Sequence, residues 1–254
     1  MASDASLMIG RREFLELALD GIALGALAVS PFAAFAQAAA GGAPLKIGTI
    51  GAGREGGALG TLFAKHGHAV MFSSRNPDQL KELVASAGPN AQAGTVEQAV
   101  AFGDVILLVV PYTAVEQIGK DHGKVLASKR LVLDVSNPIA RRDGDEIVRW
   151  ANEQGGAGLA TAKLLPGAHL VRAFNAIGSG RLVEDAERKD DPVGVPIAGD
   201  DQAAIELATS LIKEVGFEPV LIGGLAMGKY LVPGTPLAGE HTPAEIRQIA
   251  ETLK

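Results

Sequence analysis

The stretch that decides the fold is Lys46-Ile47-Gly48-Thr49-Ile50-Gly51-Ala52-Gly53-Arg54-Glu55-Gly56, where a short β-type run ends in Gly-x-Gly-x-x-Gly and a helical segment follows at once. In this pattern the first glycine turns the chain off the strand, the second lets the backbone approach a pyrophosphate, and the third lets the helix pack closely. The helix N-terminus, with its unpaired N–H groups and its dipole, favours phosphate. We therefore predict that a dinucleotide contacts Gly51, Ala52, Gly53, Arg54, Glu55 and Gly56.

The next β-type run, residues 69–73, ends about twenty residues further on, where a dinucleotide fold contacts the adenosine ribose. An acid at this point would favour NAD, but the sequence is Ser73-Ser74-Arg75-Asn76-Pro77. Hydroxyl groups and a guanidinium suit a 2′-phosphate, which a carboxylate would repel. We predict NADP as the cofactor, with contacts from Ser73, Ser74 and Arg75; the alternative is an ordinary surface turn with an exposed arginine.

Composition narrows the class of protein. The chain has 254 residues, enough for one α/β domain with an appendage, and a formal net charge of −6. No basic stripe or aromatic platform is present, which argues against nucleic acid as a partner. Cysteine is absent, so disulfides, thiol catalysis and cysteine-ligated metal centres are excluded.

Residues 1–36 have the pattern of an export signal. Gly10-Arg11-Arg12-Glu13-Phe14-Leu15-Glu16 resembles the twin-arginine motif, an apolar stretch follows over residues 21–36, and Ala34-Phe35-Ala36 is a small-residue cleavage site. We predict that the twin-arginine export machinery is a partner and that the protein is periplasmic or otherwise exported, with residues 37–44 as a linker. An N-terminal amphipathic helix or an uncleaved anchor is the alternative.

From Leu45 onward, β-type runs alternate with helical ones. The pattern predicts strands at 45–50, 69–73, 104–110, 130–135, 169–174, 194–199 and 217–222, and helices near 55–66, 77–87, 95–101, 112–120, 144–153, 158–165 and 201–215. Apolar runs such as residues 105–110 suit strands covered on both faces. The expected fold class is α/β: a Rossmann-type, doubly wound, mainly parallel sheet with helices on both faces, covering residues 45–222 and closed by a C-terminal segment and helix at 223–254.

In such a sheet, ligands bind beyond the carboxyl ends of the strands. The residues there are small, apolar or amide-bearing, and we expect these to line the nicotinamide half of the site: Val110, Pro111, Tyr112, Asn137, Pro138, Asn175 and Ala176. Each taken alone is also typical of a turn. Acids and bases are scarce in these segments, so we predict no catalytic side chain. A metal pair at His66 and His68 is less favoured than histidines placed at a helix end, and we predict no metal site.

Four motifs in this order carry a resemblance to a known family: Gly51 to Gly56, Ser73 to Pro77, Asp134-Val135-Ser136-Asn137-Pro138 and Arg172-Ala173-Phe174-Asn175. Together they resemble the NADPH-dependent F-420 reductase family, the coenzyme F-420-dependent NADP oxidoreductases. They are also similar to the oxidoreductase domain of the six-transmembrane metalloreductases. The resemblance covers about residues 45–237. It implies NADPH along the strand ends, with Ser74 and Arg75 on the 2′-phosphate, and a flavin or deazaflavin (coenzyme F-420) stacked against the nicotinamide.

The leading hypothesis is an enzyme, an NADP(H)-dependent oxidoreductase that passes hydride to a small-molecule acceptor of the flavin or deazaflavin type. Face-to-face rings need positioning and exclusion of water, without a protein acid to protonate a carbonyl. Two alternatives stay open: a reductase of a small carbonyl or imine, and a non-catalytic NADP-binding module. The glycine-rich tail after the last strand, residues 223–236, starts at the active edge in this interpretation. We expect it to close the sheet edge or to pack against a second copy in a homodimer.

Overall fold

The computed structural model describes residues 43–188 and 190–253. The predicted export signal at 1–36, and most of the predicted linker at 37–44, lie outside the described residues. Residues 43–45 precede the first strand without regular secondary structure. Within the described ranges, no helix is both long and apolar enough to cross a membrane.

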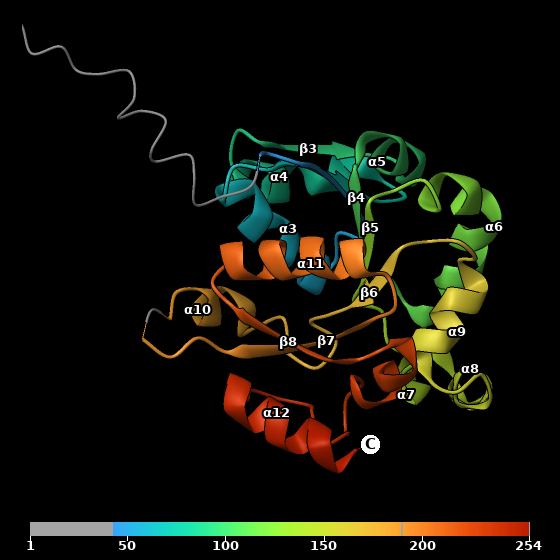
Figure 1. The fold of residues 1–254 in the computed structure, drawn as a ribbon. Coiled ribbons are helices and arrows are strands. Elements are labelled where there is room, and N and C mark those ends of the chain that lie inside the picture. Colours follow the sequence, from blue (N-terminus) through green and yellow to red (C-terminus); the bar gives the residue numbers. More distant parts are fainter. Residues whose placement is uncertain (1–42, 189, 254) are drawn as a thin grey trace, which may run out of the picture. The chain divides into compact units, whose positions relative to one another are not determined.

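A single eight-stranded sheet forms the centre of the fold (Figure 1). Its strands are β1 (Lys46–Ile50), β2 (Ala69–Ser73), β3 (Ala91–Gly94), β4 (Val105–Leu108), β5 (Leu131–Asp134), β6 (Leu170–Arg172), β7 (Gly194–Gly199) and β8 (Glu218–Gly223). Their spatial order is β3-β2-β1-β4-β5-β6-β7-β8. Every neighbouring pair is parallel except β6 and β7. The predicted Rossmann-type, mainly parallel α/β fold is therefore confirmed.

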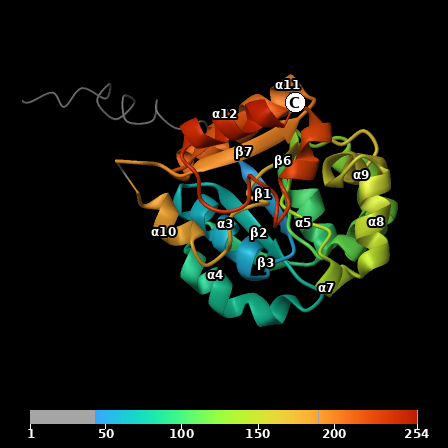
Figure 2. The ribbon, with the colours of Figure 1, turned by 90° about the horizontal axis from the view of Figure 1, so that it is seen from below.

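Helices cover both faces of this sheet (Figure 2). They are α3 (Arg54–Lys65), α4 (Lys81–Ala87), α5 (Val96–Phe102), α6 (Val115–Leu126), α7 (Ala140–Asp143), α8 (Asp145–Glu153), α9 (Ala157–Leu164), α10 (Leu182–Ala186), α11 (Gln202–Glu214) and α12 (Pro243–Thr252), with 3₁₀ turns η1 (Pro77–Leu80), η2 (Tyr112–Ala114) and η3 (Leu225–Tyr230). One apolar core lies under α3 and α11, and a second lies under α5, α6, α8 and α9. A smaller core joins α12 and η3 to β8.

Strand β3 was missed by the sequence pattern. Its residues, Ala91-Gln92-Ala93-Gly94, have low β-propensity, and only Gly94 is buried. The strand exists because its backbone pairs in parallel with β2 at the edge of the sheet. Backbone pairing with β2 therefore makes this segment a strand, and its amino-acid sequence alone does not predict one.

The direction of β7 corrects one expectation about the tail. Because β7 runs antiparallel to β6 and β8 runs parallel to β7, the tail leaves β8 at the edge opposite to the carboxyl ends of β1, β4, β5 and β6. The prediction that the tail starts on the active edge was wrong. The short helix α10 lies in the connection between β6 and β7. A connection of this kind returns beside β6 without crossing the sheet, which gives an antiparallel pair.

Candidate functional site

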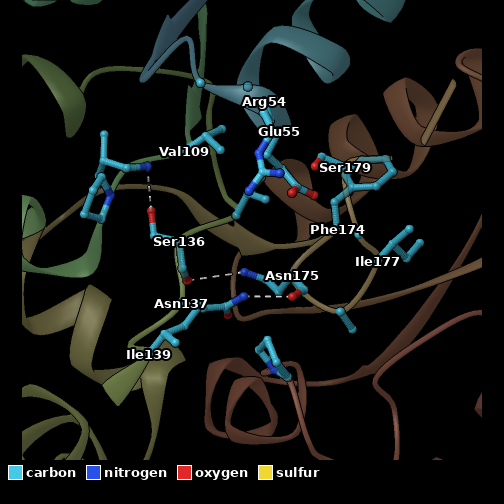
Figure 3. A pocket seen from close by; sticks show the side chains of 18 of the residues that line it. Arg54, Glu55, Val109, Ser136, Asn137, Ile139, Phe174, Asn175, Ile177 and Ser179 are labelled. Atoms are coloured by element: carbon cyan, nitrogen blue, oxygen red, sulfur yellow. Dashed lines mark hydrogen bonds between the residues drawn. The ribbon is translucent and has the colours of Figure 1, made fainter. Parts of the chain in front are cut away.

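A pocket of about 520 Å³ opens at the carboxyl ends of four parallel strands. The turn between β1 and α3 forms one wall, the segments after β4 and β5 form the floor, and the segment after β6 forms the opposite wall (Figure 3). The tail returns to this edge and adds Pro233 to the lining. The volume is in the range of small-molecule and cofactor sites, and the place is where open α/β sheets bind ligands.

The three glycines in the turn between β1 and α3 have different roles: internal packing requires two of them, and the third leaves space for a ligand. A Cβ on Gly51, whose φ is +96°, would lie 2.2 Å from the Val109 carbonyl oxygen, and one on Gly56 would lie 2.0 Å from the Gly51 carbonyl oxygen. A Cβ on Gly53 would meet no atom within 4 Å. Internal packing therefore requires glycine at the first and third positions and leaves open space at the second, which fits a close approach by a pyrophosphate.

Helix α3 begins at this open space. Gly53 is its N-cap, and no side chain caps the helix. The first N–H groups of a helix have no partner within it, and they attract phosphate. The loop is also joined to β2, because the Ala52 N–H donates to the Ser73 carbonyl oxygen at 3.2 Å. The residues present thus fit the diphosphate of a dinucleotide.

A fully buried ion pair supports the floor of the pocket. Asp134 and Arg172 are register partners at the ends of β5 and β6. Arg172 Nη1 donates to Asp134 Oδ2 at 2.6 Å and to the Ser136 carbonyl oxygen at 3.0 Å, and both side chains are 0% exposed. Arg172 Nη2 donates to Asn137 Oδ1 at 2.9 Å. A buried charge needs a partner and further hydrogen bonds, and this arrangement supplies both.

The side chains of Asn137 and Asn175 each donate a hydrogen bond to the backbone of the segment that carries the other. Asn137 Nδ2 donates to the Asn175 carbonyl oxygen at 2.7 Å, and Asn175 Nδ2 donates to the Asp134 carbonyl oxygen at 3.0 Å. Figure 3 shows these groups on neighbouring segments below Ser136. Asn175 Oδ1 is buried and has no hydrogen-bond partner among the described residues. The segment after β5 is therefore fixed to the segment after β6, with one amide oxygen left as an acceptor.

Phe174 forms the turn in the segment after β6, which is one wall of the pocket. It is the one non-glycine residue with positive φ, at 61°, in the described part of the chain, and its side chain is buried. Its ring packs edge-on against Phe217, with ring centroids 5.4 Å apart. A left-handed conformation costs a phenylalanine free energy, so the surrounding packing must hold it. The turn directs Asn175, Ile177 and Ser179 along the pocket wall (Figure 3).

Glu55 is the only acid among the described residues that line the pocket, which also include the basic side chains of Arg54 and Arg142. Burial raises the pKa of Glu55 to about 7, against opposing effects from a hydrogen bond with the Ser179 backbone and from the charge of Arg54. Arg142 is held by Asp143 at 2.9 Å and donates to the Asn137 carbonyl oxygen at 2.5 Å. The described residues contain no cluster of three or more metal-ligating side chains.

The structure brings most of the predicted site residues to this one pocket. Nine of them line it: Gly53, Arg54, Glu55, Gly56, Val110, Pro111, Asn137, Asn175 and Ala176. Gly51 and Ala52 form the turn behind that lining, and Pro138 follows Asn137. The lining also contains residues that were not selected from the sequence, among them Ile139, Arg142, Ser179 and Pro233. Ile139, Arg142 and Ser179 lie five to eight residues beyond the ends of β5 and β6, and Pro233 lies in the tail, so the folded chain was needed to place them in the lining.

The predicted ribose-phosphate residues lie beside the pocket at the end of β2. The Ser73 hydroxyl is buried and donates to the Thr49 carbonyl oxygen at 2.8 Å, so it serves the fold. The Ser74 hydroxyl accepts from the Asn76 N–H at 3.1 Å. Arg75 is exposed. Of these three side chains, Ser74 and Arg75 are accessible to a ligand.

Tyr112 is placed differently from the prediction. Its side chain is buried, with the hydroxyl 3.1 Å from the Ala157 carbonyl oxygen and 3.1 Å from Thr161 Oγ1, and burial raises its pKa to about 12. It lines a separate cavity of about 330 Å³ beside Trp150. Because its side chain is turned away from the strand-end pocket, a contact of Tyr112 with a ligand in that pocket would involve its backbone.

The comparisons with known proteins agree with this geometry. A glycerol-3-phosphate dehydrogenase [NAD(P)+] of Staphylococcus epidermidis is 22% identical over 205 residues, which cover 68% of this chain and 62% of that protein. The chain thus spans about three fifths of the length of the curated relatives it matches first. Among solved structures, a hypothetical protein of Sinorhizobium meliloti has a TM-score of 0.63 at 24% identity, covering 78% of this chain and 95% of its own.

A second solved structure is a candidate F420-dependent NADP reductase from Arthrobacter sp. FB24, with a TM-score of 0.60 at 19% identity over 73% of this chain and 87% of its own. Fold, pocket and relatives agree on a dinucleotide-binding domain of the Rossmann type. Within this class, residues 46–138 match the family described as NADP oxidoreductase coenzyme F420-dependent. The predicted resemblance to that family is confirmed.

Proposed function

We propose that this protein transfers a hydride between NADP(H) and a flavin or deazaflavin ring bound in the strand-end pocket. The observation that carries the proposal is the character of the lining: its only ionisable side chains are Arg54, Glu55 and Arg142, and no histidine, lysine or tyrosine is among the described lining residues. Glu55 lies in the first turn of α3, at the diphosphate end of the proposed site, away from the proposed position of the rings. A carbonyl reductase needs an acid at the substrate oxygen, whereas two stacked rings need positioning and a dry surface. NADP(H) supplies the hydride chemistry when bound.

The specificity for NADP rests on Arg75 and Ser74. Both follow β2, which is joined to the glycine turn through the Ala52 N–H, and no acid replaces them there. A guanidinium can bind a 2′-phosphate in a bidentate manner. In this proposal the diphosphate binds at the N-terminus of α3, the adenosine end extends toward Arg75, and the nicotinamide occupies the pocket between Asn137 and Ile177.

The specificity test is the substitution Arg75→Glu. A charge-assisted hydrogen bond contributes about 1.5–3 kcal/mol, so NADPH affinity should fall about 10- to 100-fold while NADH affinity stays within a few fold. Arg149→Glu, which makes the same charge change on an exposed residue of α8, is the control and should leave both affinities unchanged. An unchanged preference for NADPH in Arg75→Glu would refute the 2′-phosphate assignment.

The acceptor is tested on the purified protein by following NADPH oxidation with riboflavin, FMN and a deazaflavin, beside a panel of small carbonyls and imines. Turnover with the ring acceptors supports the proposal. Turnover only with carbonyls or imines would support the reductase alternative. Tight NADPH binding without turnover on any acceptor would favour a non-catalytic dinucleotide-binding module.

Export is part of the same proposal. The twin-arginine pattern at residues 10–16 suits a protein that folds around its cofactor before it leaves the cytoplasm. Residues 1–36 fused to a reporter should direct it out of the cytoplasm. Replacing both Arg11 and Arg12 by lysine should abolish this, and retained export would refute the use of this route.

A further inference from the structure

Glu55 combines three properties that the proposed hydride transfer does not use. It is the second residue of α3, at the helix end where the diphosphate would bind. It is the only acid among the described residues of the pocket lining. Figure 3 shows its side chain reaching from α3 toward the wall that carries Ser179. A carboxyl group at this position either repels the diphosphate or binds it, depending on its protonation.

The immediate surroundings of Glu55 favour the uncharged form. Glu55 Oε1 is buried and has no hydrogen-bond partner among the described residues. An ionised oxygen in this position is costly, because no described group donates a hydrogen bond to Oε1; the hydrogen bond with the Ser179 backbone opposes the effect of burial on the pKa of Glu55 but does not cancel it. The same burial raises the pKa of Glu55 to about 7, so the free protein holds a mixture of both forms near neutral pH.

The charged groups near Glu55 do not compensate a carboxylate on their own. Helix α3 packs against α4, α10, β1, β2 and β4. The ionisable side chains on these elements are Lys81 and Glu82 on α4, Glu184 and Asp185 on α10, and Lys46 at the start of β1. Lys81 pairs with Asp78, Asp185 lies 3.5 Å from Arg181, and Arg142 in the pocket pairs with Asp143. Arg54 is the neighbour whose charge lowers the pKa of Glu55, while Glu55 Oε1 has no hydrogen-bond partner in the described structure.

We propose that Glu55 is a neutral carboxylic acid in the dinucleotide complex, so that NADP(H) binding takes up one proton from solvent at this side chain. A diphosphate at the N-terminus of α3 adds negative charge beside Glu55 and disfavours its ionised form further. The neutral acid avoids this repulsion, and its O–H can donate a hydrogen bond to a phosphate oxygen. The inference rests on dinucleotide binding in this pocket and is independent of the acceptor.

The first measurement is the dissociation constant of NADPH as a function of pH, in the wild-type protein and in Glu55→Gln. Gln keeps the shape of the neutral acid and does not ionise. Above pH 7 the wild-type constant should rise about tenfold per pH unit, which gives a difference of about 30-fold from Glu55→Gln at pH 8.5. At pH 6 the two proteins should bind with similar affinity. Glu97→Gln, an exposed acid in the first turn of α5, is the matched control and should behave as wild type.

The second measurement counts the proton directly. Calorimetric titrations with NADPH in two buffers of different protonation enthalpy at pH 8 should show uptake of about 0.9 proton by the wild type. Glu55→Gln should show none. The difference between the two proteins removes any contribution from the ligand's own phosphate.

Three outcomes would overturn the inference. One is NADPH binding without proton uptake in the wild type, which leaves the proposed function intact. Another is weaker binding by Glu55→Gln than by wild type at every pH, since that would mean the carboxylate itself is required. The third is no NADPH binding by either protein, which would refute the cofactor assignment along with this inference.

Discussion

Replacing Arg172 by methionine tests how the floor of the pocket is held together. The substitution puts an unbranched, apolar and shorter side chain in place of the guanidinium side chain, and it leaves the Asp134 carboxylate, which is 0% exposed, without its cation. It also removes the donors to the Ser136 carbonyl oxygen and to Asn137 Oδ1. Removing one partner of a buried ion pair costs about 3–5 kcal/mol, and this loss dominates over the small gain from burying a methionine.

The expected loss is large relative to the total stability of a domain, which is about 5–15 kcal/mol. For a domain of this size it corresponds to a fall in Tm of about 6–20 °C. The loss in the free energy of unfolding is measured by urea unfolding, followed through the fluorescence of Trp150, the single tryptophan. Arg149→Met is the matched control: its pair with Glu146 is exposed, with 3.9 Å between the charged atoms, and should contribute less than about 1 kcal/mol.

A double-mutant cycle separates the ion pair from simple loss of packing. Asp134→Asn alone leaves the Arg172 guanidinium buried without a counter-ion, so it should also be strongly destabilising. The double variant with Arg172→Met removes both charges and should be more stable than the sum of the single effects by at least about 1 kcal/mol. Additive effects, or a loss below about 1 kcal/mol for Arg172→Met, would refute the role assigned to the pair.

Three further predictions follow from single contacts. Gly53→Ala should fold with near wild-type stability yet bind NADPH more weakly. Gly56→Ala should fail to fold normally, because its Cβ would lie 2.0 Å from the Gly51 carbonyl oxygen. Equal effects of the two substitutions on folding would contradict this. Thr242→Ala removes the capping box of α12 and should cost about 1 kcal/mol in urea unfolding. Because the folded-state pKa of Glu55 is raised from 4.5 to about 7, the stability of the free protein should fall as the pH rises between these values, and Glu55→Gln should abolish that fall.

The first half of the fold follows from the sequence because local signals agree there. The glycine pattern, the apolar run after Lys46 and the helical run from Arg54 all specify one strand–turn–helix unit, and the structure contains it within one residue of the predicted ends. Apolar runs likewise predicted β4 and β5, although β4 ends two residues and β5 one residue earlier than predicted. Val109 and Val110 continue the apolar run but line the pocket.

The rest of the fold depends on contacts that no local pattern records. The residues of β3 have low β-propensity, and the strand is formed by pairing with β2. The direction of β7 depends on how the chain returns after α10, so neither residue composition nor periodicity indicates it. Asp134 and Arg172 were visible as motif residues, but their role as a buried ion pair required the register between β5 and β6.

The reversed direction of β7 and β8 changes how the acceptor side of the pocket is built. The tail leaves β8 at the far edge, passes through η3 and returns to place Pro233 in the pocket lining. Further along, the Gly239 N–H donates to the Ala176 carbonyl oxygen at 2.9 Å, on the wall that Phe174 turns. The glycine turn and α3 make no such bond to the tail in the described structure. Changes in the tail should therefore alter binding at the ring end of the pocket more than binding of the diphosphate at the N-terminus of α3.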